Sequence, residues 1–284
     1  MDFEKVVSGL KLLGMNLFDF ALYDESGIHS HQFQPCNRCN NSYSVAKVFV
    51  MTAVGLLWDD GMLNVSDPLY KLFQTDFPKD ADPGWKLTTV EHALTHRLGF
   101  DKGFLDIDAE DSAEYPTEDY LQIVLSHPLH YLPGTYRQYS DAAFYLLSRV
   151  VSRVACVNMD SLLFRRLFRP MHFSEVAWSR CPHEYPIGAT GLYVSARDMV
   201  KLGALYLNNG VWQGKRLISS EWISKAISSE YEFQTMTPSG LIGKGGMYGQ
   251  GLAFSREKRF AVAWHAFEKG GNGKKLIEYL DRIE

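Results

Sequence analysis

The 284-residue sequence is poor in cysteine, contains no internal repeat or low-complexity tract, and has no long apolar run. Its four cysteines fit a reducing compartment. The longest mainly apolar stretch, Val48 to Trp58, is too short to cross a bilayer, so we expect no membrane span. The 29 basic and 33 acidic residues leave a net charge of −4, which does not favour a nucleic acid or an anionic membrane as partner.

The N-terminal segment also lacks the features of a targeting sequence. Residues 1–5 (MDFEK) show no basic flank before an apolar core, as a signal peptide would. We therefore expect a soluble, cytoplasmic protein, unless an export signal has been removed. The chain is 46% hydrophobic and 13% aromatic, enough for a large core in one domain or in two interleaved ones.

A single C-x-x-C pair, Cys36 and Cys39, lies just after His29 and His31. Alternation along a strand would put both histidines on one face, so a zinc-stabilised module is one interpretation. No second C-x-x-C follows, and the spacing is not that of a familiar zinc site. We favour plain loop cysteines, with no metal and no cofactor.

Local patterns predict strands near both ends of the chain and helices between them. We expect helices over 3–13, from Ser44 to about Gly61, over 140–155 and 196–208, from Ser219, and over 274–283; strands are expected over 17–24, 28–34, 241–247, 249–255 and 259–267. This order predicts an α/β (α+β) fold, with one antiparallel sheet built from both termini, flanked by helices, and an inserted mainly helical region. The expected domains are residues 1–60 with 231–284, and residues 61–230.

The most informative stretch is Ser44-Val45-Ala46-Lys47, which opens a helix that is apolar on nearly every face. Such a helix belongs in a protein interior. A lysine there must lose its proton or find a counter-charge, because an unpaired ammonium is costly to bury. Serine and lysine at i and i+3 share one helix face, and a neutral amine beside a hydroxyl is a nucleophile with its base. The same spacing occurs at Ser8/Lys11 and Ser255/Lys258, so the tetrad needs further support.

Two later motifs provide that support. Tyr139-Ser140-Asp141 follows Pro133-Gly134 and precedes a predicted helix, and Lys244-Gly245-Gly246 lies on a predicted strand. In order, these read S-x-x-K, Y-x-[N/D] and K-x-G. The set resembles the serine β-lactamase and penicillin-binding protein superfamily, and most of all class C β-lactamases with their allied D-peptidases and esterases. Three longer segments also resemble that family: 88–100 (TTVEHALTHRLGF), 131–147 (YLPGTYRQYSDAAFYLL) and 188–222.

The resemblance implies roles for the first two motifs. Ser44 would be the acylated nucleophile, and Lys47 its base or proton relay. Tyr139 would take part in proton transfer to the leaving group. Asp141 stands where the family has asparagine, so it belongs to the same catalytic set.

The third motif has implied roles as well. Lys244 would supply positive charge for a substrate carboxylate and hold the proton network. The backbone N–H groups of Ser44 and Met247 would form the oxyanion hole, since acyl transfer needs fixed donors where charge develops. Gly245 and Gly246 would let substrate approach the strand edge closely.

The sequence also departs from the family at two of these positions. A carboxylate only accepts hydrogen bonds, so Asp141 cannot donate to a substrate carbonyl unless it is protonated. Its charge would favour a protonated Lys47, which weakens a lysine base. Gly245 lacks the hydroxyl of the usual threonine. His265-Ala266-Phe267 is a rival for the third motif, but it lacks the glycine and lies in an apolar run, which predicts the next strand.

The resemblance as a whole predicts a β-lactamase/transpeptidase-like fold and a serine hydrolase. It would act through an acyl-enzyme on a small ester or amide, as an esterase or D-peptidase rather than as an efficient β-lactamase. The alternative is a non-catalytic, penicillin-binding-protein-like homologue that binds a ligand or partner. The partner implied is a small-molecule or peptide substrate, and neither its identity nor the oligomeric state follows from the sequence.

Overall fold

The structure, a computed structural model, describes residues 1–269 and 273–283. The chain forms two compact units. The first contains Met1–Val48, Met171–Ala177 and Leu192–Glu284, and the second contains Phe49–Pro170 and Trp178–Gly191.

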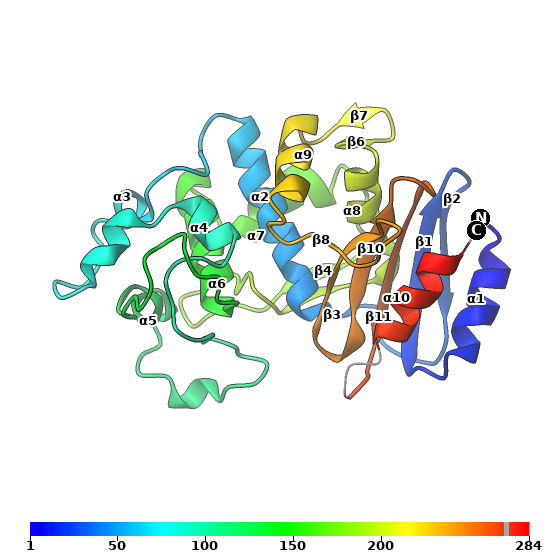
Figure 1. The fold of residues 1–284 in the computed structure, drawn as a ribbon, viewed down its shortest axis with the longest axis horizontal. Coiled ribbons are helices and arrows are strands. Elements are labelled where there is room, and N and C mark those ends of the chain that lie inside the picture. The colour runs from blue at the N-terminus through cyan, green and yellow to red at the C-terminus, as the bar shows by residue number, and fades with distance from the viewer. Residues whose placement is uncertain (270–272, 284) are drawn as a thin grey trace. The chain divides into compact units, whose positions relative to one another are not determined.

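The first unit is built on a six-stranded antiparallel sheet in the order β2-β1-β11-β10-β9-β8 (Figure 1). The strands are β1 (Leu17–Asp24), β2 (Gly27–Gln32), β8 (Gln234–Thr235), β9 (Ile242–Gly245), β10 (Gly251–Ser255) and β11 (Phe260–Ala266). Strand β1 pairs directly with β11, with Phe20 opposite Trp264. Segments from the two ends of the chain therefore lie side by side in one sheet, as the sequence predicts.

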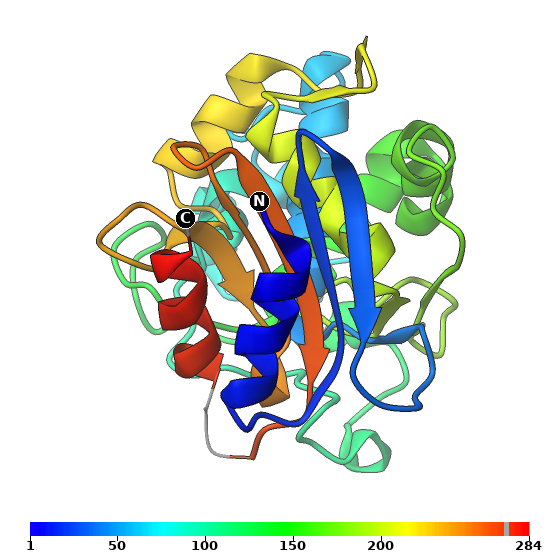
Figure 2. The same cartoon turned by 90° about the vertical axis from the view of Figure 1, so that its right-hand side faces the viewer.

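Helices cover both faces of this sheet. On one face, α1 (Phe3–Leu12) and α10 (Gly273–Arg282) lie side by side, as Figure 2 shows, and bury Leu10 and Leu276 with Phe20 and Trp264 in one apolar cluster. On the other face, α8 (Ala196–Leu207) packs against β1, β10 and β11. Gly203 lets α8 lie close to the sheet. A Cβ at this position would be only 3.2 Å from the Cβ of Ala261.

Smaller elements complete the first unit. A three-stranded sheet has the order β3 (Asn40–Asn41), β5 (Leu192–Val194) and β4 (Val176–Trp178), and β6 (Val211–Trp212) pairs with β7 (Lys215–Arg216). Helix α9 (Ser220–Ser228) begins at its N-cap, Ser219, whose hydroxyl accepts from Trp222 N–H. Near the end of α10, the Asp281 carboxylate accepts hydrogen bonds from the hydroxyls of Thr237 and Ser239, which ties the helix to the segment before β9.

The second unit is mainly helical. It contains α3 (Leu69–Leu72), α4 (Val90–Leu94), α5 (Tyr120–Leu125), α6 (Asp141–Ala155), α7 (Met159–Leu163), the 3₁₀ helices Pro83–Leu87 and Ser112–Glu114, and a π-helical turn over Phe164–Phe168. Helix α6 packs against α3, α4, α5 and α7 and is buried over its first three turns. Helix α2 (Ala46–Asp59) starts in the first unit and runs into the second, and its apolar side chains from Val48 to Leu57 are at most 1% exposed.

The predicted secondary structure is confirmed for the sheet strands and for the long helices, with ends that move by one to three residues. The compact units divide the chain differently from the predicted domains. Helices α8 and α9 lie within the predicted region 61–230 but belong to the unit that holds the sheet. The reason is that the apolar face of α8 is buried against β1 and β11. The sequence also did not predict the short strands β3 to β8.

In the described part of the chain, no single helix is long and apolar enough to cross a membrane. One pair, Asp141–Ala155 with Met159–Phe168, meets the length and composition test only when taken together, and it is bent by 67°.

Candidate active site

The predicted nucleophile and its base are in contact. Ser44 lies on a short 3₁₀ helix, η1 (Tyr43–Val45), immediately before α2, and its side chain is half-buried. Lys47 lies on the first turn of α2 and is 0% exposed. Its Nζ donates to Ser44 Oγ at 3.1 Å. The hydroxyl therefore has an amine within proton-transfer distance, and that amine is shielded from water.

Strand β9 carries Lys244 and Gly245, is followed directly by Gly246, and contacts η1. A Cβ at Gly246 would be 2.6 Å from the carbonyl oxygen of Ser42 and 3.3 Å from Tyr43 Cβ, so this position has room only for glycine. The rings of Tyr43 and Tyr248 also meet, with centroids 5.4 Å apart. The structure thus brings the first and third motifs close to each other.

The two other residues of the third motif differ in their surroundings. A Cβ at Gly245 would meet only the carbonyl oxygen of Gln250, at 3.9 Å, so a larger side chain fits there. Met247 follows at the start of a second 3₁₀ helix, η5 (Met247–Gly249). Within the described residues its backbone N–H donates to no protein acceptor, which suits the predicted oxyanion-hole donor.

Lys244 has a partner that sequence reasoning missed. Its ammonium forms an ion pair with the carboxylate of Glu232, which lies just before β8. The two side chains are 11% and 1% exposed. Glu232 stands between two buried aromatic residues, Tyr231 and Phe233. An acidic residue between two aromatic residues is the sequence signal that could have indicated a buried charge. The Lys244 cation is thus already matched by a carboxylate of the protein.

The rival for the third motif lies elsewhere in the sheet. His265 is on β11, as the apolar run predicts, and β11 lies between β1 and β10. The imidazole is fully buried, and its Nδ1 is 2.7 Å from Asp19 Oδ1 on β1. His265 therefore pairs with Asp19 inside the sheet, whereas Lys244 lies on the strand next to η1.

The second motif belongs to the second unit. Ser140 caps the start of α6, and its backbone N–H donates to Nδ1 of the buried His96 at 3.3 Å. The ring of His96 lies 4.5 Å from that of Tyr139, measured between centroids. A Cβ at Gly103 would be 2.8 Å from the carbonyl oxygen of Tyr139, so this loop packs closely on the motif. Tyr139 is thus held by His96 and by the loop around Gly103.

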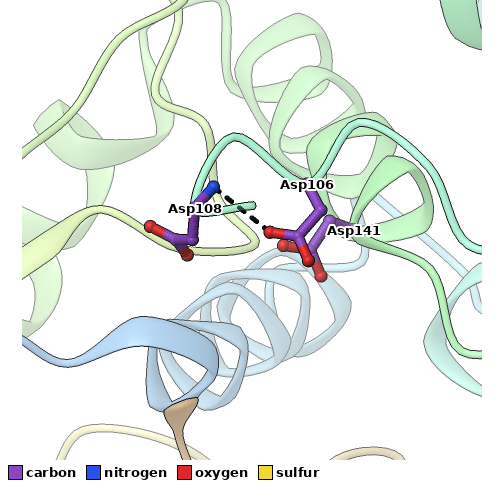
Figure 3. A group of neighbouring side chains, drawn as sticks. All are labelled: Asp106, Asp108 and Asp141. Atoms are coloured by element: carbon purple, nitrogen blue, oxygen red, sulfur yellow. Dashed lines mark hydrogen bonds between the residues drawn. The ribbon is translucent and has the colours of Figure 1, made fainter. Parts of the chain in front are cut away.

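Asp141 is one of three neighbouring carboxylates, which Figure 3 shows together. Ligand oxygens of Asp106, Asp108 and Asp141 all lie within 4.8 Å of one another. Asp108 N–H donates to Asp106 Oδ1 at 3.2 Å, and the Thr190 hydroxyl donates to Asp108. An all-oxygen set of this kind has the chemistry to hold a hard divalent cation. Sequence reasoning singled out Asp141 but not the two acids that a loop brings to it.

The cysteine–histidine cluster does not gather as a metal site in the described chain. His29 Nε2 is 2.8 Å from Ser26 Oγ, and the Cys39 thiol lies 3.3 Å from Glu175 Oε2. Burial, reinforced by the Glu175 carboxylate, raises the pKa of the Cys39 thiol to about 12.

The predicted site residues therefore fall into two groups. Ser44, Lys47, Lys244, Gly246 and Met247 gather in the first unit. Tyr139 and Asp141 belong to the second unit, and their part in the reaction stays a prediction.

Comparison with known proteins agrees with this arrangement. The family model described as Beta-lactamase matches residues 41–279, a stretch that includes all three motifs. A relative in Alkalihalophilus pseudofirmus, itself an uncharacterized protein, is 22% identical over 205 residues. That match covers 66% of this chain but only 53% of the relative, so the chain spans about half the length of the curated relative it matches.

Solved structures share the fold at low sequence identity. A Bacillus anthracis protein provisionally named as a 6-aminohexanoate-dimer hydrolase superposes with a TM-score of 0.82 at 14% identity, covering 96% of this chain and 80% of that one. The D-amino acid amidase of Ochrobactrum anthropi SV3 superposes with a TM-score of 0.70 at 16% identity, covering 98% of both chains. At these identities the likeness establishes the fold, and it confirms the predicted fold class.

Proposed function

Because the chain belongs to the beta-lactamase family, we propose that it is a serine hydrolase that cleaves a small ester or amide through an acyl-enzyme. The observation that carries the proposal is the contact between Ser44 Oγ and the buried Lys47 Nζ, at 3.1 Å. A serine hydroxyl is a weak nucleophile on its own and needs an adjacent base. Lys47 is in position to act as that base.

The reaction follows from this contact. Ser44 Oγ attacks the substrate carbonyl carbon while its proton passes to the neutral Lys47 amine. The oxyanion that forms accepts hydrogen bonds from the backbone N–H groups of Ser44 and Met247. The intermediate then collapses, the C–O or C–N bond to the leaving group breaks, and in this proposal the proton that Lys47 accepted passes to the leaving group by way of Tyr139. Water hydrolyses the acyl-enzyme and returns Ser44 to its starting state.

Two positions favour an esterase or amidase over an efficient β-lactamase. Asp141 replaces an amide that could donate to a substrate carbonyl with a carboxylate that only accepts. Gly245 offers no hydroxyl to a substrate carboxylate, although the space for a side chain is present.

The same two positions, together with the Lys244–Glu232 ion pair, favour a second candidate. In it, the chain is a non-catalytic relative that binds a ligand or partner. Intact-mass spectrometry after exposure to a fluorophosphonate, and separately to a penicillin, separates the two. A covalent adduct on Ser44 supports the enzyme, and the preferred reagent indicates its substrate class. The absence of any adduct supports the binding protein.

Substitution of the nucleophile tests the proposal directly. Ser44→Ala should abolish hydrolysis of 4-nitrophenyl esters and covalent labelling, while the melting temperature changes little. Ser8→Ala is a matched control, because Ser8 and Lys11 repeat the same spacing on α1, where Ser8 is exposed. Wild-type esterase activity in Ser44→Ala would assign the chemistry to another residue.

A further inference from the structure

Lys244 and Glu232 form an ion pair in the unit that also holds the candidate nucleophile. Lys244 is the one residue of the third motif that carries charge, and the resemblance assigns it to a substrate carboxylate. In this chain its ammonium is paired with Glu232. Both residues lie within the first unit, and Lys244 is on β9, the strand that is followed directly by Gly246 and its close approach to Ser42.

Glu232 is fixed where it is. Its neighbour Tyr231 packs on Trp222 of α9, with ring centroids 5.9 Å apart. Its other neighbour, Phe233, meets Tyr206 of α8 at 4.7 Å and Phe254 of β10 at 5.3 Å. With both flanking side chains anchored in the core, the Glu232 carboxylate cannot swing away from Lys244 without moving the packed segment.

The charges then argue against a carboxylate in the substrate. Glu232 is 1% exposed, and a buried carboxylate without a counter-charge is costly, so Lys244 stays bound to it. A substrate carboxylate would have to share one ammonium with Glu232 and would meet its negative charge in a poorly solvated place. Gly245 supplies no hydroxyl donor to compensate.

We propose that Glu232 is a specificity-determining residue that neutralises Lys244 and restricts the site to esters or amides whose acyl part carries no carboxylate. The inference rests on the proposed function, and it narrows the substrate class of the same site. An opposite charge within hydrogen-bond distance typically changes the protonation equilibrium of the neighbouring group by about 10-fold or more. Removing the Glu232 charge should therefore improve the use of a carboxylate substrate by about that factor.

Two esters of equal length test this. We compare kcat/KM for 4-nitrophenyl pentanoate and for mono-4-nitrophenyl glutarate, which differ only in a terminal methyl or carboxylate. Wild type should prefer the pentanoate, and Glu232→Gln should shift the ratio toward the glutarate by about 10-fold or more. Adding Gly245→Thr should shift it further, since the space at this position admits a side chain. Glu230→Gln, the same change at an exposed position two residues earlier, should leave the ratio unchanged.

A binding measurement tests the role of Glu232 without relying on ester hydrolysis. Calorimetric titration with benzoylglycine should show tighter binding to Glu232→Gln than to wild type, and no change for Glu230→Gln. If the esters are cleaved through Ser44 but neither the ratio nor the binding changes, Glu232 does not set specificity and the inference fails alone. If no ester is cleaved, the proposed function fails, and the titration still decides whether Glu232 blocks a carboxylate at Lys244. Melting temperatures confirm that each variant is folded.

Discussion

Replacing Lys244 with methionine should destabilise the protein strongly. The substitution keeps an unbranched side chain of similar length but removes the ammonium that pairs with Glu232. Glu232 is 1% exposed, so its carboxylate would lose this counter-charge in the interior. Breaking a buried pair by removing one partner typically costs about 3–5 kcal/mol.

Thermal unfolding gives the size of the effect. In a chain of this length 1 kcal/mol corresponds to about 2–4 °C, so the melting temperature of Lys244→Met should fall by about 10 °C. Adding Glu232→Gln to Lys244→Met removes the carboxylate charge that has lost Lys244 and should restore a large part of the loss. The two substitutions are therefore expected to be far from additive, as neighbours in direct contact usually are.

An exposed ion pair provides the control. Lys274 and Glu278 lie on α10 with Nζ 3.8 Å from Oε1, and their side chains are 83% and 49% exposed. Pairs of this kind contribute about 0–1 kcal/mol, so Lys274→Met should change the melting temperature by roughly 2 °C or less. If Lys244→Met melts as close to wild type as this control does, Glu232 does not depend on Lys244, and the reasoning on substrate charge loses its basis.

Three further predictions concern other ionisable groups. Asp141→Asn should shift the pH–rate profile to lower pH and speed acylation by penicillins, and identical profiles would remove Asp141 from the catalytic set. Because burial and Glu175 raise the pKa of the Cys39 thiol to about 12, iodoacetamide at pH 8 should label the exposed Cys156 far faster than Cys39, as peptide mass mapping can measure; equal rates would contradict the thiol's environment. Two hydroxyl donors hold the pKa of Asp281 below its ordinary value of 3.8. The ionised carboxylate therefore stabilises the fold fully above pH 3.8, and this stabilisation is lost as the pH falls through the lower pKa of the folded state. Asp281→Asn should thus lower the melting temperature at pH 7 but not at about pH 2, and an equal loss at both would show that the carboxylate charge is not involved.

Most of the backbone plan was predictable from local patterns. Alternation and apolar runs placed β1, β10 and β11, and capping residues such as Ser219 marked where helices begin. The membership of α8 in the sheet unit was not predictable in this way. Its amphipathic pattern shows that one face is buried, but not which partner buries it.

The candidate site also has parts that local sequence patterns predict and parts that they do not. Ser44 and Lys47 are three residues apart, so helix geometry alone predicts the contact that the structure shows at 3.1 Å. The order of the motifs was enough to predict the family, which the match over residues 41–279 confirms. Glycine at position 246 was suggested by the motif, and the nearby Ser42 carbonyl provides its physical reason.

The sequence by itself determined the residue types, the apolar helix that contains Lys47, and the positions of the strands near both ends of the chain, because these depend on neighbours within a few positions along the chain. Only the tertiary structure decided which charges meet. Glu232 and Lys244 pair because strand β9 folds back beside the segment before β8, and Asp106 and Asp108 reach Asp141 through a loop more than thirty residues away in sequence. Electrostatic interactions depend on distance in space and on burial, and no periodic pattern in the sequence encodes either.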